Sequence, residues 1–590
     1  MYRTAGVAAH RTRTLWTGAW ARQSAFTRLR LDFLDHLSEI NNSDHEDVIV
    51  LDDEENDNDS DEELVVTGSR HVSQDQTRKV VDIDQVQRVA RGPLRLLPGY
   101  DVQLADQSFL RIVEHLPDTG RGVRIRGPRL LFQNQPELLM PERKHELVQL
   151  VKINNKMEEE YTTDTVNVDQ VVRNCTVVFT NREYNDLHYR KHIGTITDDE
   201  DDAPIYFCRW MSADSNVGIE GRDPSGPPLA GRDERIRAHQ ADNGALVTPE
   251  GPVEFSIPDS ELRRQWRGEP RSPDKDYSFG DTFCGAGGTT AGAFQAGLRL
   301  KFGVDFDEQA IRTYKYNFGI SGTKAMRCDI SDFIKAASMS PGRYLVDFLH
   351  MSPPCQPFCG ANRNPNLQMN EQNIHSFGKV PAILEICKPR IVTLEEAKSL
   401  LDIDKRAHFR DLICWFIRKG YSVQWKAVDL SRYGVPQTRN RLIIIAAGFP
   451  YRPGEQLPPF VQPTHGTGPG LLPPPSINRA INSIPVDAPH QEDIPRMRKL
   501  DRAYSGEGLC RTIMTSVKQH HYHPCGTRRF SIREYASLQT FAHDFVFSGT
   551  LLEKLRQIGN AVPPLFAETL FKHLKAALTA ADEAEDGRER

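Results

Sequence analysis

Cys355 has the surroundings best suited to nucleophilic chemistry in this chain. It follows Pro353 and Pro354 in a rigid turn, a short distance after the apolar, strand-like run 344–349. A cysteine attacks as its thiolate, which a helix N-terminus or a nearby cation must stabilise. A lone cysteine is more often a small buried apolar residue, so its interpretation as a nucleophile depends on the segments around it. The nearby Cys359 is assigned that structural role.

Glycines and acids at three successive strand ends predict a pocket for a nucleoside. Gly285 and Gly287 lie in a turn that leads from an apolar run into a helical stretch, where the backbone can approach a ligand closely. Asp305 ends the next apolar run about twenty residues later, where an acid can hold ribose hydroxyls. Asp329 ends a third run and can accept a hydrogen bond from an adenine amino group. The alternative is that these are turn glycines and ordinary surface acids. The occurrence of such residues at three successive strand ends favours the pocket.

A carboxylate and two arginines further along the chain are suited to recognise a base. Glu395 ends the strand-like run 389–396 and can bind the N3 and exocyclic amino edge of cytosine. Arg439 and Arg441 alternate, which places both guanidinium groups on one face of a strand, able to hold a base carbonyl or a phosphate. The polar stretch 360–378 lacks periodicity and is typical of a loop that closes over substrate.

The elements that must position these residues follow a regular alternation. From Tyr277 onward, strand-like runs alternate with helical stretches. This order predicts an α/β fold with a parallel sheet and helices on both of its faces. The glycine turn and the acids are expected to form their pocket at the carboxyl edge of that sheet.

In combination, these segments resemble the cytosine-5 DNA methyltransferase family. The resemblance covers residues 277–576, which is over half of the chain. The matching segments, in the family's order, are 283–287, Asp305, Asp329, Pro354-Cys355-Gln356, Glu395, Gln437-x-Arg439-x-Arg441, 529–541 and 557–563.

The resemblance implies a Rossmann-like, S-adenosylmethionine-dependent domain that methylates C5 of a cytosine flipped out of double-stranded DNA. Cys355 would be the nucleophile that forms a covalent adduct, and Glu395 would be the partner of N3. Arg439 and Arg441 would support the base and the loop, and the segment 559–560 would complete the cofactor pocket. The residues expected to bind the cofactor are Phe283, Gly285, Gly287, Asp305, Phe306, Asp329, Pro353, Asn560 and Val562.

The residues after Glu395 depart from the family's pattern. The family has Glu-Asn-Val where this chain has Glu395, Glu396 and Ala397. A second carboxylate there is expected to disfavour the thiolate and slow its attack. The Glu-Glu pair resembles the divergent fungal group of RID/Masc-type de novo methyltransferases, linked to silencing of repeated DNA in the sexual cycle. This resemblance implies de novo methylation and silencing of repeated DNA in a fungus.

Two other functions remain as alternatives. A catalytically weak, methyltransferase-like scaffold would bind cofactor or DNA and recruit silencing partners, with Glu396 in the place of an uncharged amide. An RNA cytosine methyltransferase is the third hypothesis. The additional N-terminal module and the acidic arm disfavour it.

Residues 1–94 are predicted to be disordered, and they account for the negative net charge of the chain. The stretch 44–63 carries twelve acids and no Lys or Arg, so the net charge of −6 becomes +6 without it, which suits a polyanionic partner. The four residues from Val48 to Leu51 precede an acid run and resemble a SUMO-interacting motif, which would add a strand to a partner's sheet edge. A solvated acidic tail with an incidental apolar island is the alternative.

Residues 95–212 carry strand-like runs bounded by turn residues, which predicts a β-rich module. It resembles, faintly, a BAH domain, a chromatin-reading module, so histone tails are a candidate partner; a β-rich spacer is the alternative. Residues 213–275 are rich in Gly, Pro, Asp and Arg and are predicted to be a linker. The methyltransferase domain is placed at 276–580, with a target-recognition region at 450–528 that is too small for extensive base-specific readout.

Cysteine and histidine spacing argues against metal sites and disulfides. The segment from His520 to Cys525 is interpreted as a loop near DNA, and no metal is expected. The ten cysteines are scattered, which argues for a reducing compartment. No run of about eighteen apolar residues exists, so no membrane-spanning segment is expected. A DNA-modifying enzyme with a chromatin-like module is expected in the nucleus.

Overall fold

The structure is a computed structural model that describes most of the chain from residue 94 onward. The described residues are 79–81, 94–116, 122–133, 138–141, 143, 145–153, 159–160, 163–182, 205–214, 230–248, 251–258, 261–262, 276–354, 374–448, 457–491, 503–515 and 523–589. The predicted disordered region 1–94, with the segment from Val48 to Leu51, lies almost entirely outside them. Among the described helices, none has the length and apolarity needed to cross a bilayer.

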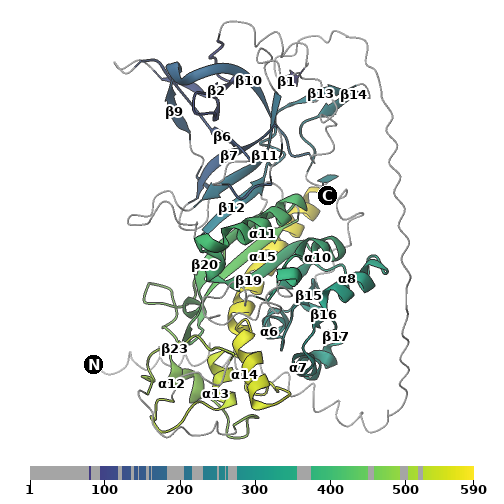
Figure 1. Cartoon of the computed structure of the whole chain (residues 1–590), viewed down its shortest axis with the longest axis vertical. Coiled ribbons are helices and arrows are strands. Elements are labelled where there is room, and N and C mark those ends of the chain that lie inside the picture. Colours follow the sequence, from purple (N-terminus) through teal and green to yellow (C-terminus); the bar gives the residue numbers. More distant parts are fainter. Residues whose placement is uncertain are drawn as a thin grey trace. The chain divides into compact units, whose positions relative to one another are not determined.

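The C-terminal half is built around a sheet with the strand order β17-β16-β15-β18-β19-β22-β20 (Figure 1). Neighbours from β17 to β19 are parallel, whereas β22 is antiparallel to both β19 and β20. The prediction of a parallel sheet is therefore wrong for β22, because a short connection from β20 returns the chain as a hairpin does. The strands are β15 (Ser278–Thr282), β16 (Arg299–Asp305), β17 (Lys324–Arg327), β18 (Phe348–Met351), β19 (Ile391–Ala397), β20 (Ser422–Asp429), β21 (Gln437–Thr438), β22 (Asn440–Ala447) and β23 (Cys510–Arg511).

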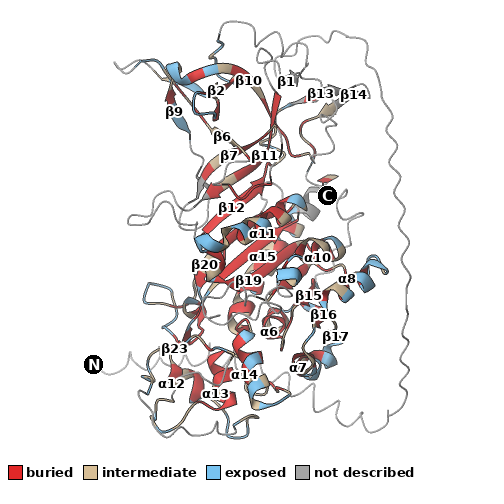
Figure 2. Cartoon of the chain, viewed as in Figure 1, coloured by how far each residue is buried: buried red, intermediate tan, exposed pale blue. Residues whose placement is uncertain are grey.

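Helices cover both faces of this sheet, because successive strand residues point to opposite sides. Phe348 on β18 contacts Phe571 of α15, with ring centroids 6.3 Å apart. The next residue, Leu349, joins the core cluster that contains Phe333 of α8 and Ile383 of α10. Figure 2 shows the strands buried and parts of α8 and α11 exposed. The helices are α6 (Gly288–Gln295), α7 (Glu308–Phe318), α8 (Ile330–Ser338), α10 (Val380–Cys387), α11 (Arg406–Arg418), α12 (Ile477–Ile481), α13 (Ile532–Leu538), α14 (Leu551–Asn560) and α15 (Pro564–Glu589).

Capping boxes fix the start of the helices that bring the C-terminal segment back to the sheet. Ser531 accepts a hydrogen bond from the N–H of Glu534 at 3.2 Å, and the Glu534 carboxylate accepts from the N–H of Ser531 at 2.7 Å. Thr550 starts α14 in the same way. α15 then packs closely on α6, where a Cβ on Gly292 would lie 2.5 Å from that of Ala567. The register of the C-terminal helices is therefore encoded locally.

The described residues of 95–212 lie mostly in β-strands. Their core contains Phe109 and Tyr206, whose ring centroids are 4.6 Å apart, with Phe132 against them. The strands are β2 (Asp101–Leu104), β3 (Phe109–Arg111), β4 (Glu114–Leu116), β5 (Arg124–Gly127), β6 (Arg129–Phe132), β7 (Glu146–Ile153), β8 (Glu159–Glu160), β9 (Asp164–Asn167), β10 (Val171–Phe179) and β11 (Ile205–Asp214), and a separate small sheet contains β1 (Lys79–Val81), β13 (Gly244–Thr248) and β14 (Gly251–Glu254).

The predicted linker 213–275 contains a buried strand, so this prediction is wrong for part of the stretch. β12 (Ala230–Arg235) pairs with β11 of the module on one side and with β20 on the other. All of its residues are buried, including Arg232, Asp233 and Glu234. Arg232 pairs with Glu234, and Asp233 accepts a hydrogen bond from Ser212 at 2.6 Å. Charged residues are rarely buried unless they are paired, so composition alone concealed this strand.

Candidate active site

The turn after β15 leaves open space beside its backbone. Phe283 and Gly285 have positive φ angles of 61° and 52°, and Gly287, with a φ of 89°, caps the N-terminus of α6. A Cβ on Gly287 would lie 2.3 Å from a ring carbon of Phe318, so only glycine fits there. Among the residues that the structure describes, a Cβ on Gly285 would meet nothing within 4 Å. The turn therefore presents an unobstructed backbone at the carboxyl end of a central strand.

Asp305, the last residue of β16, holds this turn in place. Its Oδ2 accepts a hydrogen bond from the N–H of Gly285 at 2.8 Å, and its Oδ1 accepts one from Asp307 at 2.9 Å. Burial raises the pKa of Asp305, and the backbone hydrogen bonds oppose that effect. An ionised carboxylate accepts about four hydrogen bonds. Acceptor positions therefore remain for the ribose hydroxyls that the sequence predicts.

The strand ends next to the turn expose an aromatic ring and a carboxylate. Phe306 follows β16 and is 68% exposed, which is unusual for a large apolar side chain. Asp329 follows β17, is exposed, and caps α8 by accepting a hydrogen bond from the N–H of Ser331 at 2.8 Å. Because β16 and β17 are parallel neighbours, both groups lie at the carboxyl edge of the sheet. They are available to a ligand bound against the glycine turn.

The end of α14 returns to the same turn. A Cβ on Gly288 would lie 2.4 Å from the carbonyl oxygen of Val562, so the two backbones are in contact. Val562 is buried, whereas Asn560, the last residue of α14, is exposed. The structure thus brings together the two ends of the predicted cofactor pocket, which lie far apart in the sequence.

The predicted nucleophile Cys355 lies outside the described residues, as does most of the predicted closing loop. The chain is described as far as Pro353, which is buried, and Pro354. Just before them, the N–H of Ser352 donates to the carbonyl of Thr282 on β15 at 3.3 Å. The segment that leads to the predicted nucleophile therefore leaves the sheet beside the strand that carries the glycine turn.

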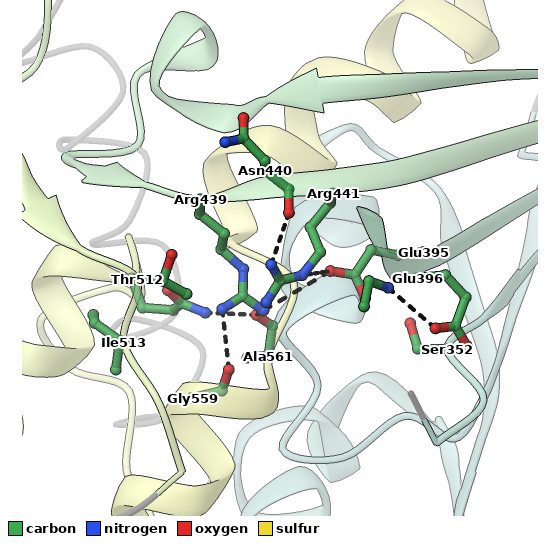
Figure 3. A network of polar contacts seen from close by, with 12 residues as sticks. Ser352, Glu395, Glu396, Arg439, Asn440, Arg441, Thr512, Ile513, Gly559 and Ala561 are labelled. Atoms are coloured by element: carbon green, nitrogen blue, oxygen red, sulfur yellow. Dashed lines mark hydrogen bonds and ion pairs between the residues drawn. The ribbon is translucent and has the colours of Figure 1, made fainter. Parts of the chain in front are cut away.

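A carboxylate and two arginines form a buried ion-pair network on the neighbouring strands (Figure 3). Glu395 on β19 is 6% exposed, and Nε of Arg441 lies 2.8 Å from its Oε1. Nη2 of Arg439 lies 3.8 Å from the same oxygen. The two arginines alternate at the start of β22, which brings both guanidinium groups to the same carboxylate.

Arg439 is buried and is hydrogen-bonded to the backbone at the end of α14, the segment predicted to complete the cofactor pocket (the cofactor segment). It is 1% exposed, and it donates from Nη1 to the carbonyl of Gly559 and from Nη2 to that of Ala561, both at 3.1 Å. The sequence predicts that either arginine can hold a base carbonyl or a phosphate. The burial of Arg439 leaves that role to Arg441, whose side chain is 17% exposed. Arg439 joins Glu395 to the segment that closes the predicted cofactor pocket.

Two buried glutamines, to which the sequence alone assigns no role, extend this network. Gln437 donates from Nε2 to Oε1 of Gln539 at 2.5 Å and accepts from the N–H of Ile513 at 3.2 Å. Gln539 donates in turn to the carbonyl of Ala561 at 2.5 Å. The pairing of β21 with β23 reinforces this link. The predicted target-recognition region is therefore connected to Ala561, which Arg439 also contacts. The sequence alone does not reveal this connection.

Glu396 lies on the opposite face of β19 from Glu395, as successive strand residues do. It is fully buried, and its Oε2 accepts a hydrogen bond from the N–H of Ala397 at 3.1 Å. Figure 3 shows its carboxyl directed away from the two arginines and toward Ser352. The second carboxyl therefore stands outside the Glu395 network, near the strand end that leads to the predicted nucleophile.

A buried acid beneath the glycine turn is a further feature that sequence reasoning missed. Asp281 on β15 is 1% exposed and accepts a hydrogen bond from Oγ1 of Thr290 at 2.6 Å. Its Oδ1 has no hydrogen-bond partner among the described residues. Burial raises the pKa of Asp281 to about 8. At neutral pH this carboxyl is therefore protonated, because ionisation would leave an unpaired charge in the interior.

The histidine-rich segment shows no metal geometry in its described part. Within the ranges that the structure covers, no group of three or more His, Cys, Asp and Glu side chains is arranged to hold a metal ion. Nε2 of His523 lies 3.4 Å from Oε1 of Glu534. Nδ1 of His523 accepts a hydrogen bond from the N–H of Cys525 at 3.1 Å. These contacts close a turn at the start of the segment that leads into α13.

The segments that carry the glycine turn, the acidic strand ends and the Glu–Arg network all lie within the match to one family model. The family model described as C-5 cytosine-specific DNA methylase matches residues 277–493 and 477–576. The chain belongs to this family. It is a DNA cytosine-5 methyltransferase, and S-adenosylmethionine is its cofactor.

Individual relatives align with the methyltransferase half of the chain. The type II methyltransferase M.Sau96I of Staphylococcus aureus is 29% identical over 334 residues, which cover 51% of this chain and 76% of that protein. The DNA (cytosine-5)-methyltransferase PliMCI of Paracentrotus lividus is 28% identical over 196 residues, covering 31% of this chain and 12% of that protein. Among solved structures, the S. pombe Dnmt2 methyltransferase covers 52% of this chain and 98% of its own, with a TM-score of 0.37 and 14% identity.

Proposed function

We propose that the protein methylates cytosines in double-stranded DNA through a covalent adduct on Cys355. The observation that carries this proposal is the buried Glu395 carboxylate, paired with Arg441 and tied through Arg439 to the cofactor segment. A carboxyl held in this way keeps one orientation, as recognition of the N3 and amino edge of cytosine requires. The base must be flipped out of the helix, since its C6 is inaccessible within the stack.

The residues around the glycine turn fit S-adenosylmethionine. The open space beside Gly285 admits a ligand close to the backbone, and Asp305 has acceptor positions for ribose hydroxyls. The exposed ring of Phe306 offers a face for adenine, whose amino group can donate to Asp329. Asn560 is exposed on the other side of the turn. When bound, the cofactor supplies an electrophilic methyl group for C5 of the target base.

Cys355 and Glu395 would carry the bond changes at the base. The thiolate of Cys355 forms a bond to C6 while Glu395 holds a proton at N3, which makes C5 nucleophilic. After C5 has gained the methyl group, loss of the C5 proton to a base and departure of the thiolate from C6 restore the ring. Arg441, beside Glu395 and partly exposed, would support the carbonyl oxygen of the base.

The variant Cys355→Ser tests the proposal. It should form no covalent adduct with a duplex that contains 5-fluorocytosine and should transfer no methyl group from labelled cofactor. Its affinity for the cofactor should equal that of the wild type. Cys359→Ser is the matched control and should trap DNA normally. Undiminished methyl transfer by Cys355→Ser would sink the proposal.

The sequence Glu395-Glu396-Ala397 supports a finer assignment, to de novo methylation and silencing of repeats as in the fungal RID/Masc-type group. A carboxylate next to Glu395 is expected to disfavour the thiolate of Cys355. Glu396→Asn should therefore raise the rate of methyl transfer several-fold. Unmethylated and hemimethylated duplexes should be methylated equally well; a strong preference for hemimethylated DNA contradicts de novo activity. An inactive wild type that gains activity on this substitution favours the scaffold alternative.

The N-terminal regions support a role on chromatin in the nucleus. The acidic context of the segment from Val48 to Leu51 suits a SUMO surface, and the β-rich module 95–212 suits a BAH-like reader of histone tails. Replacing Val48 and Ile49 by Ala in the full chain should abolish SUMO binding and leave methyl transfer unchanged. SUMO affinity that survives both substitutions contradicts this part of the proposal.

A further inference from the structure

A buried histidine lies beneath the strand end that leads to the nucleophile. His350 on β18 is 3% exposed and pairs in register with Thr393 on β19. Its Nδ1 lies 2.8 Å from Oγ1 of Thr393, and its Nε2 lies 2.6 Å from Oγ of Ser352. Each ring nitrogen thus has a hydroxyl partner. One partner is on the neighbouring strand, and the other is on the segment that leads to Cys355.

The surroundings keep this imidazole uncharged. Burial lowers the pKa of His350 to about 3, so the ring is neutral at physiological pH. A neutral imidazole has one donor nitrogen and one acceptor nitrogen, and a hydroxyl can serve either of them. Thr393, His350 and Ser352 therefore form a satisfied chain of hydrogen bonds in both tautomers. These hydrogen bonds fix the orientation of the imidazole ring and of the Ser352 side chain, and the ring does not act as a base.

The backbone after His350 has little freedom. The N–H of Ser352 donates to the carbonyl of Thr282 at 3.3 Å while its hydroxyl bonds His350. Pro353, which is buried, and Pro354 follow, and the ring of each proline fixes its φ angle. The direction in which the chain leaves the sheet is thus set at Ser352, three residues before the nucleophile.

We propose that His350 is a positioning residue that, through Ser352, orients the segment carrying Cys355 toward the target cytosine. This inference rests on the proposed function of Cys355. Thr393 holds the ring from the other side, so that the imidazole keeps its edge toward Ser352. The side-chain hydrogen bonds of His350 are separate from the ion pair of Glu395 with Arg441 and from the hydrogen bond between Asp305 and Gly285. The effect therefore falls on formation of the adduct, and binding of the cofactor is unaffected.

Three variants of the full chain test this role by the rate of adduct formation on a 5-fluorocytosine duplex at saturating cofactor. Ser352→Ala should slow trapping about tenfold, the effect of losing about one hydrogen bond. His350→Gln places an amide near the position of Nε2 and keeps the contact with Ser352, whereas His350→Asn reaches only toward Thr393. His350→Gln should therefore trap DNA faster than His350→Asn.

Separate outcomes decide the inference and the proposed function. A lower kcat with unchanged KM for DNA and unchanged cofactor affinity supports positioning, as does the ranking of Gln above Asn. Equal trapping by wild type and Ser352→Ala overturns the positioning role and leaves the proposed function intact. A wild type that traps no DNA overturns the proposed function, and the inference with it.

The partly exposed Ser352 keeps the test decisive if a His350 variant fails to fold. Ser338→Ala is the matched control, because that serine bonds only the carbonyl of Ile334 within α8 among the contacts that the structure gives it, at 2.9 Å. It should trap DNA at the wild-type rate. A loss in Ser338→Ala as large as that in Ser352→Ala would overturn the specific role of the His350 contact.

Discussion

The two sides of the proposed active site, one for the cofactor and one for the target base, are built in different ways. The cofactor side consists of strand ends whose ligand-binding groups are open, with Phe306 68% exposed and Asp305 bonded to the nearby Gly285. On the target side, Glu395 is 6% and Arg439 1% exposed. Arg439 is hydrogen-bonded to Gly559 and Ala561, which lie 120 and 122 residues further along the chain.

This difference follows from what each side has to do. A cofactor can satisfy exposed groups when it arrives, so that side needs little internal support. A carboxyl that must meet one edge of a base has to be held before the base enters. A buried carboxylate is also stable only when it is paired. Substitutions on the cofactor side should therefore change affinity, and those on the target side should change rate and stability.

The largest effect is expected from Glu395→Gln. Glutamine keeps the shape of the side chain, yet it cannot hold a proton at N3 in the same way and carries no charge to pair with Arg441. We expect kcat to fall by about 10²–10⁴-fold, with unchanged cofactor affinity, in single-turnover methyl transfer. A loss that appears mainly in cofactor affinity would show that the two sides do not act separately.

Arg439→Met should affect both sides, because this guanidinium connects them. It removes the donor to the carbonyl of Gly559 and one of the two donors to that of Ala561, and it leaves Glu395 paired with Arg441 alone. Breaking a buried pair costs about 3–5 kcal/mol of unfolding free energy. Chemical denaturation should show that loss, and calorimetry should show weaker cofactor binding. Arg441→Met is the control and should reduce activity with a smaller loss of stability. Wild-type stability in Arg439→Met contradicts the connection.

Asp305→Asn should act on the cofactor alone. Both oxygens of Asp305 accept a backbone hydrogen bond, from Gly285 and from Asp307. Asparagine replaces one of these oxygens by an NH₂ group, which cannot accept from a backbone N–H or a ribose hydroxyl. The dissociation constant of S-adenosylmethionine should rise about tenfold, with unchanged kcat at saturating cofactor. The exposed Asp332 of α8 provides a control, since Asp332→Asn should bind cofactor as the wild type does. A lower kcat in Asp305→Asn would place this residue on the target side.

The smallest effect on activity, together with an effect on stability that depends on pH, is expected from Asp281→Asn. The folded protein keeps the proton on Asp281 up to a pKa of about 8, whereas the unfolded chain loses it near the usual 3.8. The unfolded state therefore binds fewer protons in this window, and stability falls as the pH rises from about 4 to about 8. The gain in Tm from Asp281→Asn should be larger at pH 8 than at pH 6. An equal gain in Tm at pH 6 and pH 8 would show that Asp281 is not protonated in the folded protein.

The alternation of strands and helices was predictable because it depends on local pattern. Strand ends at Asp305 and Asp329 follow from apolar runs that stop at an acid, and the helix after Gly287 follows from the turn. The pattern failed at β12, where charged residues are buried. Their burial is tolerated because partners from other segments pair with them, and apolar periodicity contains no signal for such partners.

By itself, the sequence determined which chemical groups this methyltransferase has and in what order: the glycine turn, the two acids, Cys355 and Glu395. These follow from residue types at strand ends, which neighbours a few positions away control. Only the tertiary structure decided that Arg439 is bonded to Ala561 and that His350 is bonded to Ser352. Such contacts depend on which strands become neighbours and which side chains they bury together, and that choice is made by packing across the whole domain.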